Sequence, residues 1–155
     1  MSKRPPILPP ALGLLMMLAV FTVHFIRPGT IFWHYPINFI ALIPIFIGAT
    51  LNVLADKELR AKGVIAPNGE YNENLGILVT SGVYRFTRNP AYLGLVLIIG
   101  GLAIWVGSLT PWLVVGLFTF ILTQFYIRPE EQRLSEELGL RYEQYCKLVP
   151  RWFIR

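Results

Sequence analysis

The chain has 155 residues, of which 54% are hydrophobic and 15% are charged, and its formal net charge is +5. A soluble domain carries roughly 25% charged residues, so this composition excludes an ordinary soluble globular protein. The single cysteine excludes a disulfide framework and a thiolate metal cluster, and we expect no metal site.

The apolar residues fall into three long blocks, at 8–26, 36–55 and 91–127. The second block has about 20 residues, which as a helix span roughly 30 Å, the thickness of a bilayer core. The third is too long for one span and divides at residues 107–111, which gives two spans of about 17 residues. The first has no cleavage site behind it and is interpreted as a retained anchor. We expect an all-α integral membrane protein with four transmembrane helices, a single domain over residues 1–155.

Basic residues indicate the orientation of these spans. Of the 14 Lys and Arg residues, 13 lie in the N-terminal segment, the connection 56–89 or the tail 128–155, and only Arg27 lies elsewhere. The positive-inside rule makes these three segments cytoplasmic, with both termini on that side. The net charge therefore reflects topology, and no nucleic-acid partner is expected.

The two cytoplasmic segments hold nearly all the ionisable residues. In the connection, the second helix is expected to continue to Gly63, followed by a turn-rich stretch at 66–76 and an extended or irregular one at 77–86. The tail predicts a C-terminal amphipathic helix that begins at Arg128 and ends before Pro150. Its apolar stripe consists of Leu134, Leu138, Tyr142, Tyr145 and Val149. The spans themselves contain no Asp, Glu, Lys or Arg, which is evidence against ion-coupled transport.

Most polar candidates also have a structural explanation. Asn89 followed by Pro90 is typical of a helix start, with Asn as the cap and Pro in the first turn. Glu130 and Glu131 would suit a helix N-terminus through the macrodipole. Three glycines in the third span, Gly94, Gly100 and Gly101, are expected to allow close helix packing. His24 and His34 are expected to be structural or interfacial residues and not ligands.

Two polar segments of the sequence are more specific for a protein family together than either is alone. "LVTSGVYRFTRNPAYLG" is followed by about 35 apolar residues and then by "EEQRLSEELGLRYEQYCKLVPRW". This pattern, over roughly residues 76–152, resembles the isoprenylcysteine carboxyl methyltransferase family, which groups with the membrane phospholipid methyltransferases. The resemblance implies transfer of a methyl group from S-adenosylmethionine to a lipophilic acceptor at the cytoplasmic face, with S-adenosylhomocysteine as product.

The resemblance also implies a site within residues 64–155. Carried over by position, the cofactor contacts are Gly76, Ile77, Leu78, Val79, Tyr84, Asn89, Pro90, Ala91, Tyr92 and Glu130. Arg85 and Glu131 join this set because the cofactor carries a carboxylate and an ammonium group. Catalytic roles are assigned to Glu130, Arg88 and Arg128. The expected pocket is roofed by the two cytoplasmic segments, with its floor on the last two spans.

Two positions depart from the prenylcysteine enzymes. Asn89 stands where they have His, and it cannot titrate near neutral pH. Tyr126 stands where they have an Arg, four residues before the first Glu, and a phenol cannot hold a carboxylate bidentately. A prenylcysteine carboxylate is therefore disfavoured as the acceptor, while lipid amines, thiols, phenols and isoprenoid acids remain. Two other functions are alternatives: an NADPH-dependent reductase of the sterol-reductase type, and a non-catalytic membrane scaffold.

Overall fold

A computed structural model describes residues 8–66 and 76–153, and every regular element in these ranges is a helix. The α-helices are α1 (Pro9–Ile26), α2 (Leu42–Ala61), α3 (Pro90–Val106), α4 (Pro111–Leu122), α5 (Arg128–Leu138) and α6 (Leu140–Leu148). Two short 3₁₀ segments, η1 (Ile37–Ala41) and η2 (Gly82–Arg85), and a π-helical segment, η3 (Thr123–Ile127), complete the set. The all-helical prediction is confirmed for these residues, whereas most of the expected turn-rich stretch lies outside them.

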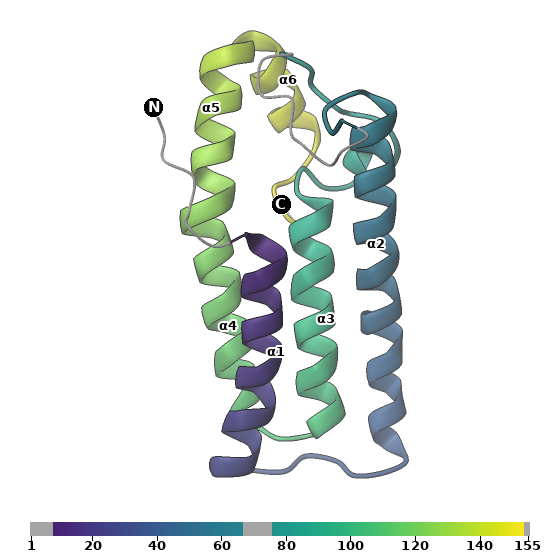
Figure 1. The fold of residues 1–155 in the computed structure, drawn as a ribbon, viewed down its shortest axis with the longest axis vertical. Coiled ribbons are helices and arrows are strands. Elements are labelled where there is room, and N and C mark those ends of the chain that lie inside the picture. The colour runs from purple at the N-terminus through teal and green to yellow at the C-terminus, as the bar shows by residue number, and fades with distance from the viewer. Residues whose placement is uncertain (1–7, 67–75, 154–155) are drawn as a thin grey trace.

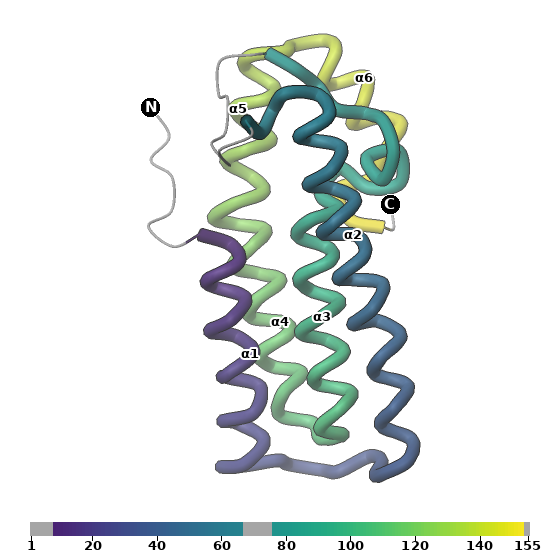
Figure 2. Tube along the Cα trace, turned by 45° about the vertical axis from the view of Figure 1, so that its right-hand side comes forward, coloured from purple at the N-terminus to yellow at the C-terminus, as the bar shows by residue number. Residues whose placement is uncertain are grey.

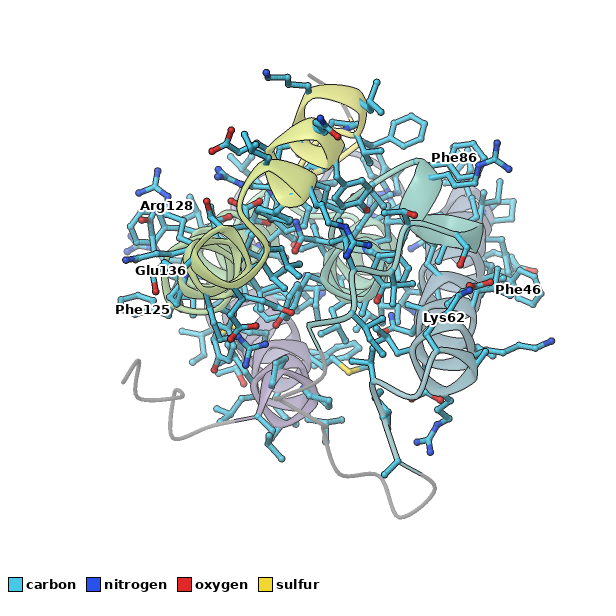
Figure 3. The ribbon with its side chains drawn as sticks, turned by 90° about the horizontal axis from the view of Figure 1, so that it is seen from above. Phe46, Lys62, Phe86, Phe125, Arg128 and Glu136 are labelled. Atoms are coloured by element: carbon cyan, nitrogen blue, oxygen red, sulfur yellow. The ribbon has the colours of Figure 1, made fainter. Side chains whose placement is uncertain are left out.

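Helices α1 to α4 run side by side as a bundle, with α3 packed against the other three (Figure 1). Three described helices are long and apolar enough to cross a membrane, namely those over Pro9–Ile26, Ile37–Ala61 and Pro111–Leu138. Helix α3 is apolar but has only 17 residues. Large apolar side chains on the outside of the bundle are exposed, such as Phe25 at 80% and Phe46 at 74% (Figure 3). A lateral surface of this kind is stable in lipid and identifies a membrane protein.

Glycines bring α2 and α3 into close contact. A Cβ atom at Gly94 would collide with the side chain of Asn52 and the backbone of Gly48, and one at Gly101 would collide with Ile45. The predicted close packing at Gly94 and Gly101 is therefore confirmed. At Gly100 the prediction is wrong, because an added Cβ would meet nothing within 4 Å.

The predicted division of the third apolar block at 107–111 is also present. Gly107 ends α3 with φ +70, and Pro111 begins α4. Here His24 Nδ1 lies 2.7 Å from Ser108 Oγ, so this histidine joins α1 to the α3–α4 turn. Such a contact agrees with the structural role expected for His24.

Helix α5 begins at Arg128, as predicted, but it is not a separate helix. α4, η3 and α5 form one continuous rod without a change of direction (Figure 1). Pro129 cannot donate a backbone hydrogen bond, and the π-helical turn before it allows the helix to continue without that bond. Glu130 and Glu131 therefore do not lie at a free helix N-terminus, and the macrodipole explanation for them is wrong.

The tail forms two helices where one was predicted. Gly139 has φ +52 and ψ −127, a conformation that favours glycine, and it separates α5 from α6. Helix α6 consequently turns back over the end of the bundle (Figure 2). The apolar stripe still gathers into one cluster: Tyr142, Tyr145 and Val149 are buried and pack with Leu78, Leu134, Leu138 and Cys146.

Candidate functional site

A small cavity lies at this end of the molecule, enclosed by the end of α2, the segment 77–79, η2, and helices α5 and α6. Its volume is about 70 Å³. One part of its wall is apolar, from Leu59, Val64, Ile77, Leu78, Val79 and Leu134. The other part is polar, from Tyr84, Arg88, Asn89, Glu130, Glu131, Tyr142 and Tyr145. Both polar segments of the sequence therefore contribute to one site.

Two arginines hold Glu131 in place. Arg151 binds its carboxylate in a bidentate manner, with Nη2 2.6 Å from Oε2 and Nε 3.1 Å from Oε1. Arg88 Nη1 lies 3.1 Å from Oε1, and the Arg88 and Glu131 side chains are only 14% and 13% exposed. The hydrogen bond to Glu131 raises the pKa of Arg151. These three partly buried side chains join α5 to the start of α3 and to the tail. Together the two guanidinium groups and the carboxylate carry a net charge of +1.

Glu130 lies deeper, toward the bundle. Tyr92 Oη donates a hydrogen bond to Glu130 Oε2 over 3.2 Å. The Tyr92 ring lies 6.3 Å from that of Tyr126, which η3 carries and which is buried at 9% exposure. Glu130 thus marks the boundary between the polar site and the apolar core of α1, α3 and α4.

Asn89 does more than begin a helix. It precedes α3, but its side chain makes no capping hydrogen bond. Its Nδ2 instead donates to the carbonyl of Arg151 over 2.9 Å, and its own exposure is only 8%. The structural explanation by capping is therefore wrong for this side chain, which ties the start of α3 to the tail and borders the cavity.

The tyrosines of α6 are neutral walls. Burial, reinforced by the negative charge of Glu131, raises the pKa of Tyr142. Burial also raises the pKa of Tyr145 to about 12. Tyr145 Oη donates to the carbonyl of Tyr84 over 2.7 Å. Both phenols stay protonated at neutral pH and provide hydrogen bonds and aromatic surface without charge.

The structure brings most of the predicted site residues together, although no ligand tests their roles. Eight line the cavity: Ile77, Leu78, Val79, Tyr84, Arg88, Asn89, Glu130 and Glu131. Six do not: Gly76, Arg85, Pro90, Ala91, Tyr92 and Arg128. Of these, Tyr92 contacts Glu130, whereas Arg85 and Arg128 are exposed.

Sequence reasoning missed part of the wall. Tyr142 and Tyr145 belong to the tail motif and to the apolar stripe but were not assigned to the site, and Leu59 and Val64 were not considered. The 3–4 spacing of the stripe was the available signal, because it placed Leu134, Tyr142 and Tyr145 on one side. No comparable signal existed for Arg151, since its role depends on how the tail folds back onto α5.

A second, more open hollow of about 640 Å³ lies outside the Arg88–Glu131 pair, between α5 and α6. Arg128 lines it, with Nη1 2.7 Å from Gln124 Oε1, and so does Cys146, whose Sγ lies 2.6 Å from Arg88 Nη1. Among the described residues no group of His, Cys, Asp or Glu could hold a metal ion. Charged and amide groups, with aromatic walls, therefore make up the chemistry of this end.

A helical bundle with an exposed apolar surface, and a pocket with polar and apolar walls at one end, characterise this membrane protein. The family model described as "Phospholipid methyltransferase" matches residues 37–141, more than half of the chain. The chain belongs to this phospholipid methyltransferase family, which confirms the resemblance seen in the sequence.

One curated relative supports the same grouping. Over 77 residues the chain is 36% identical to the Protein-S-isoprenylcysteine O-methyltransferase of Schizosaccharomyces pombe (strain 972 / ATCC 24843). This match covers 48% of the chain and 31% of that protein, so the chain spans about a third of the relative's length. No solved structure matches the chain significantly.

Proposed function

We propose that this protein is an S-adenosylmethionine-dependent methyltransferase that methylates a lipophilic acceptor at the cytoplasmic face of a membrane. One observation carries the proposal. The two motif segments of the methyltransferase pattern, far apart in the chain, both line one small cavity at the end of the bundle. A scaffold would have no need for an enclosed set of carboxylate, amide, guanidinium and phenol groups there.

The donor and acceptor groups of the cavity fit the cofactor. Arg88 keeps a buried Nε–H for which the structure shows no hydrogen-bond partner among the described residues, and a carboxylate would satisfy it. Glu130 and Asn89 are suited to the ammonium and hydroxyl groups, and Tyr84 and Tyr145 are suited to an adenine ring. S-adenosylmethionine would supply an electrophilic methyl group on a sulfonium.

The chain's own residues then have two tasks. Glu130 places a negative charge at the inner boundary of the site, where it favours a cationic group. Tyr142 and Tyr145, neutral and buried, keep water away and lower the local polarity. The cavity of about 70 Å³ is well below the roughly 300–1,000 Å³ of ligand sites, so its wall opens for binding. The contacts of α6 and of Arg151 are those that must loosen.

The acceptor meets this site from the bilayer. Tyr126 is buried beside Tyr92, and Arg128 is exposed on another face, so neither places a guanidinium where the prenylcysteine enzymes have one. An acceptor with a free carboxylate therefore fits less well than an amine, a thiol or a phenol. This is a difference from the S. pombe relative, whose name specifies isoprenylcysteine.

The proposal includes a topology of four spans, with both termini cytoplasmic. Helix α3, with 17 residues, is about 26 Å long and lies at the lower limit for a spanning helix. Because α3 is central in the bundle and lies between α2 and α4 in the chain, we expect α3 to cross the membrane as the third of the four spans. The end that carries α5, α6 and the end of α2 is then the cytoplasmic one (Figure 1).

The test is calorimetric titration of S-adenosylmethionine into the purified protein in a neutral detergent, with NADPH as the comparison. We expect saturable binding of S-adenosylmethionine alone. Binding of NADPH alone would favour a reductase, and binding of neither would favour a scaffold. Either of these results would overturn the proposal.

Two variants test the assigned residues. Glu130→Gln removes the inner charge, and Asn89→Ala removes the amide beside the cavity; each should abolish measurable binding of S-adenosylmethionine. Glu136→Gln is the matched control, because Glu136 lies on the same helix but is exposed and outside the cavity. Normal affinity in both test variants would contradict the site, provided circular dichroism shows them folded.

A further inference from the structure

Two segments far apart in the chain lie side by side at the cytoplasmic end and form what we call the seam, residues 84–89 and 145–153. Five hydrogen bonds join them: Tyr145 Oη to Tyr84 O (2.7 Å), Arg88 N to Pro150 O (2.9 Å), Asn89 Nδ2 to Arg151 O (2.9 Å), Thr87 Oγ1 to Arg151 O (3.1 Å) and Arg88 Nη1 to Cys146 Sγ (2.6 Å). The seam therefore behaves as one structural unit, in which the tail is attached to the segment before α3.

The two faces of the seam differ in character. Its inner face lines the cavity with Tyr84, Arg88, Asn89 and Tyr145. Three of its apolar side chains are largely exposed instead: Phe86 at 66%, Leu148 at 76% and Phe153 at 70%. Phe86 lies at the periphery of the bundle, on the side away from Arg128 and Glu136 (Figure 3). None of the three lines the cavity or the hollow, so we assign Phe86, Leu148 and Phe153 to one outer face of the seam.

The seam lies at the level where the helices change from apolar to charged. Phe86 is four residues before Pro90, where the apolar helix α3 begins. Ser81 Oγ donates to Glu58 Oε2 over 2.6 Å, which fixes the same segment to α2 just beyond Asp56, its first charged residue. In the proposed topology this level is the cytoplasmic headgroup layer, where aromatic and basic side chains are favoured.

Basic residues accompany the outer face. Arg85 is adjacent to Phe86 and Arg141 is on α6, and both are exposed. Glu143 and Lys147 of α6 both lie on the side of the hollow next to α5, so these two opposite charges lie there rather than on the outer face. Exposed apolar side chains flanked by cations are the combination that binds an anionic membrane surface.

We propose that the outer face of the seam docks onto anionic lipid headgroups of the cytoplasmic leaflet, and that this docking holds α6 and the tail closed over the cavity. The proposal deepens the proposed function by naming a lipid that regulates the same site, and it rests on that function only for cytoplasmic orientation and cofactor affinity. Because one unit faces lipid on one side and the cavity on the other, lipid binding and cofactor binding are coupled reciprocally.

The experiment uses the full chain in nanodiscs of phosphatidylcholine alone or of phosphatidylcholine mixed with phosphatidylglycerol. Hydrogen–deuterium exchange is followed for peptides that cover residues 84–89 and 140–151, without cofactor. We expect exchange several-fold slower in the anionic discs. Equal exchange in both compositions would overturn the proposal. Since no cofactor is added, this readout can fail or succeed independently of methyltransferase activity.

Variants separate the seam from general surface charge. Arg85→Gln with Arg141→Gln should abolish the dependence on lipid composition, whereas Arg85→Lys with Arg141→Lys should keep it. Phe86→Ser with Leu148→Ser should give fast exchange in both compositions. Lys57→Gln with Lys62→Gln is the control, because it removes two exposed charges from the same end on α2 (Figure 3). If this control also abolished the effect, specific docking of the seam would be disproved.

Discussion

At the scale of single residues, Glu131 links separate segments of the chain around the candidate site. Its carboxylate is shared by Arg88, from the segment before α3, and by Arg151, from the tail. Each guanidinium alone would be a partly buried charge with poor compensation, and the carboxylate neutralises one of them. The three residues come from three separate segments, so their pairing contributes to the tertiary arrangement more than to any one helix.

Substitution of Glu131 by Gln should therefore destabilise the protein. Two cations would then lie 14% and 35% exposed without a counter-charge. We expect a loss of roughly 2–4 kcal/mol, somewhat below the range for fully buried pairs because Arg151 is partly solvated. Thermal unfolding in detergent measures it. Glu137→Gln, which affects only an exposed pair with Arg133 at 3.8 Å, should change stability by less than about 0.5 kcal/mol. Equal shifts in the two variants would contradict this account of Glu131.

The residue scale also shows how far the motif could predict the site. Positions carried over from the motif, such as Tyr84, Asn89 and Glu130, lie around one cavity as expected. Arg85 was included for its charge, yet it is exposed, because sequence spacing alone does not say which side of η2 a side chain occupies. Arg151 was missed for the converse reason, since its partner is 20 residues away across a turn at Gly139.

At the scale of elements, the contact between α2 and α3 positions the site. Gly48 and Gly94 allow the two backbones to approach closely, and Asn52 Nδ2 donates to the Gly48 carbonyl over 3.0 Å within this contact. Small residues at helix interfaces have this effect in membranes, where association depends on packing. Leu59 of α2 and Asn89, which precedes α3, both line the cavity, so the contact between these helices fixes two parts of its wall relative to each other.

Gly94→Ala should force α2 and α3 apart. The added methyl group would overlap Asn52 and the backbone of Gly48, which cannot move aside without separating the helices. We expect a loss of roughly 1–3 kcal/mol, as for overpacked cores, measured by thermal unfolding in detergent. Gly100→Ala, on the same helix but with open space around it, is the control and should be neutral or slightly stabilising. A larger loss in Gly100→Ala than in Gly94→Ala would refute the packing argument.

Element boundaries were predicted with uneven success. The start of α3 at Pro90, the turn at Gly107 and the end of α2 near Gly63 follow from proline and glycine, whose backbone preferences are local. The continuous rod of α4, η3 and α5 was not foreseen, because a proline in a helix can be accommodated by a π-helical turn or can break the helix. Only the packing around Tyr126 and Ile127, both buried, selects the first outcome.

At the scale of the whole molecule, the distribution of polarity along the bundle axis defines two ends. The described charged residues, apart from Arg27, lie on the end of α2, around η2, and on α5 and α6. The opposite end contains the turn at Gly107 and the connection from α1 to α2 (Figure 1). The proposed orientation places the first end in the cytoplasm, so that a water-soluble cofactor and a lipid-soluble acceptor reach the site from different sides.

Cysteine labelling tests this orientation. In a Cys146→Ser background, Thr30→Cys places a thiol on an exposed position at one end, and Ser135→Cys places one on exposed α5 at the other. A membrane-impermeant maleimide added to intact cells should label Thr30→Cys only. Ser135→Cys should react after permeabilisation, which serves as the control for reactivity. Labelling of Ser135→Cys in intact cells would contradict the topology.

The amino-acid sequence by itself determined that the protein is helical and lipid-embedded, because hydrophobic block length, charge placement and proline–glycine punctuation are local properties of the chain. The candidate site residues came from the motif resemblance, and their roles stay predictions. The tertiary structure alone decided that the tail folds back at Gly139, that Arg151 pairs with Glu131, and that Tyr142 and Tyr145 close the cavity. These features depend on contacts between segments far apart in the chain. Their free energies arise from burial and charge pairing, which no local pattern of residues specifies.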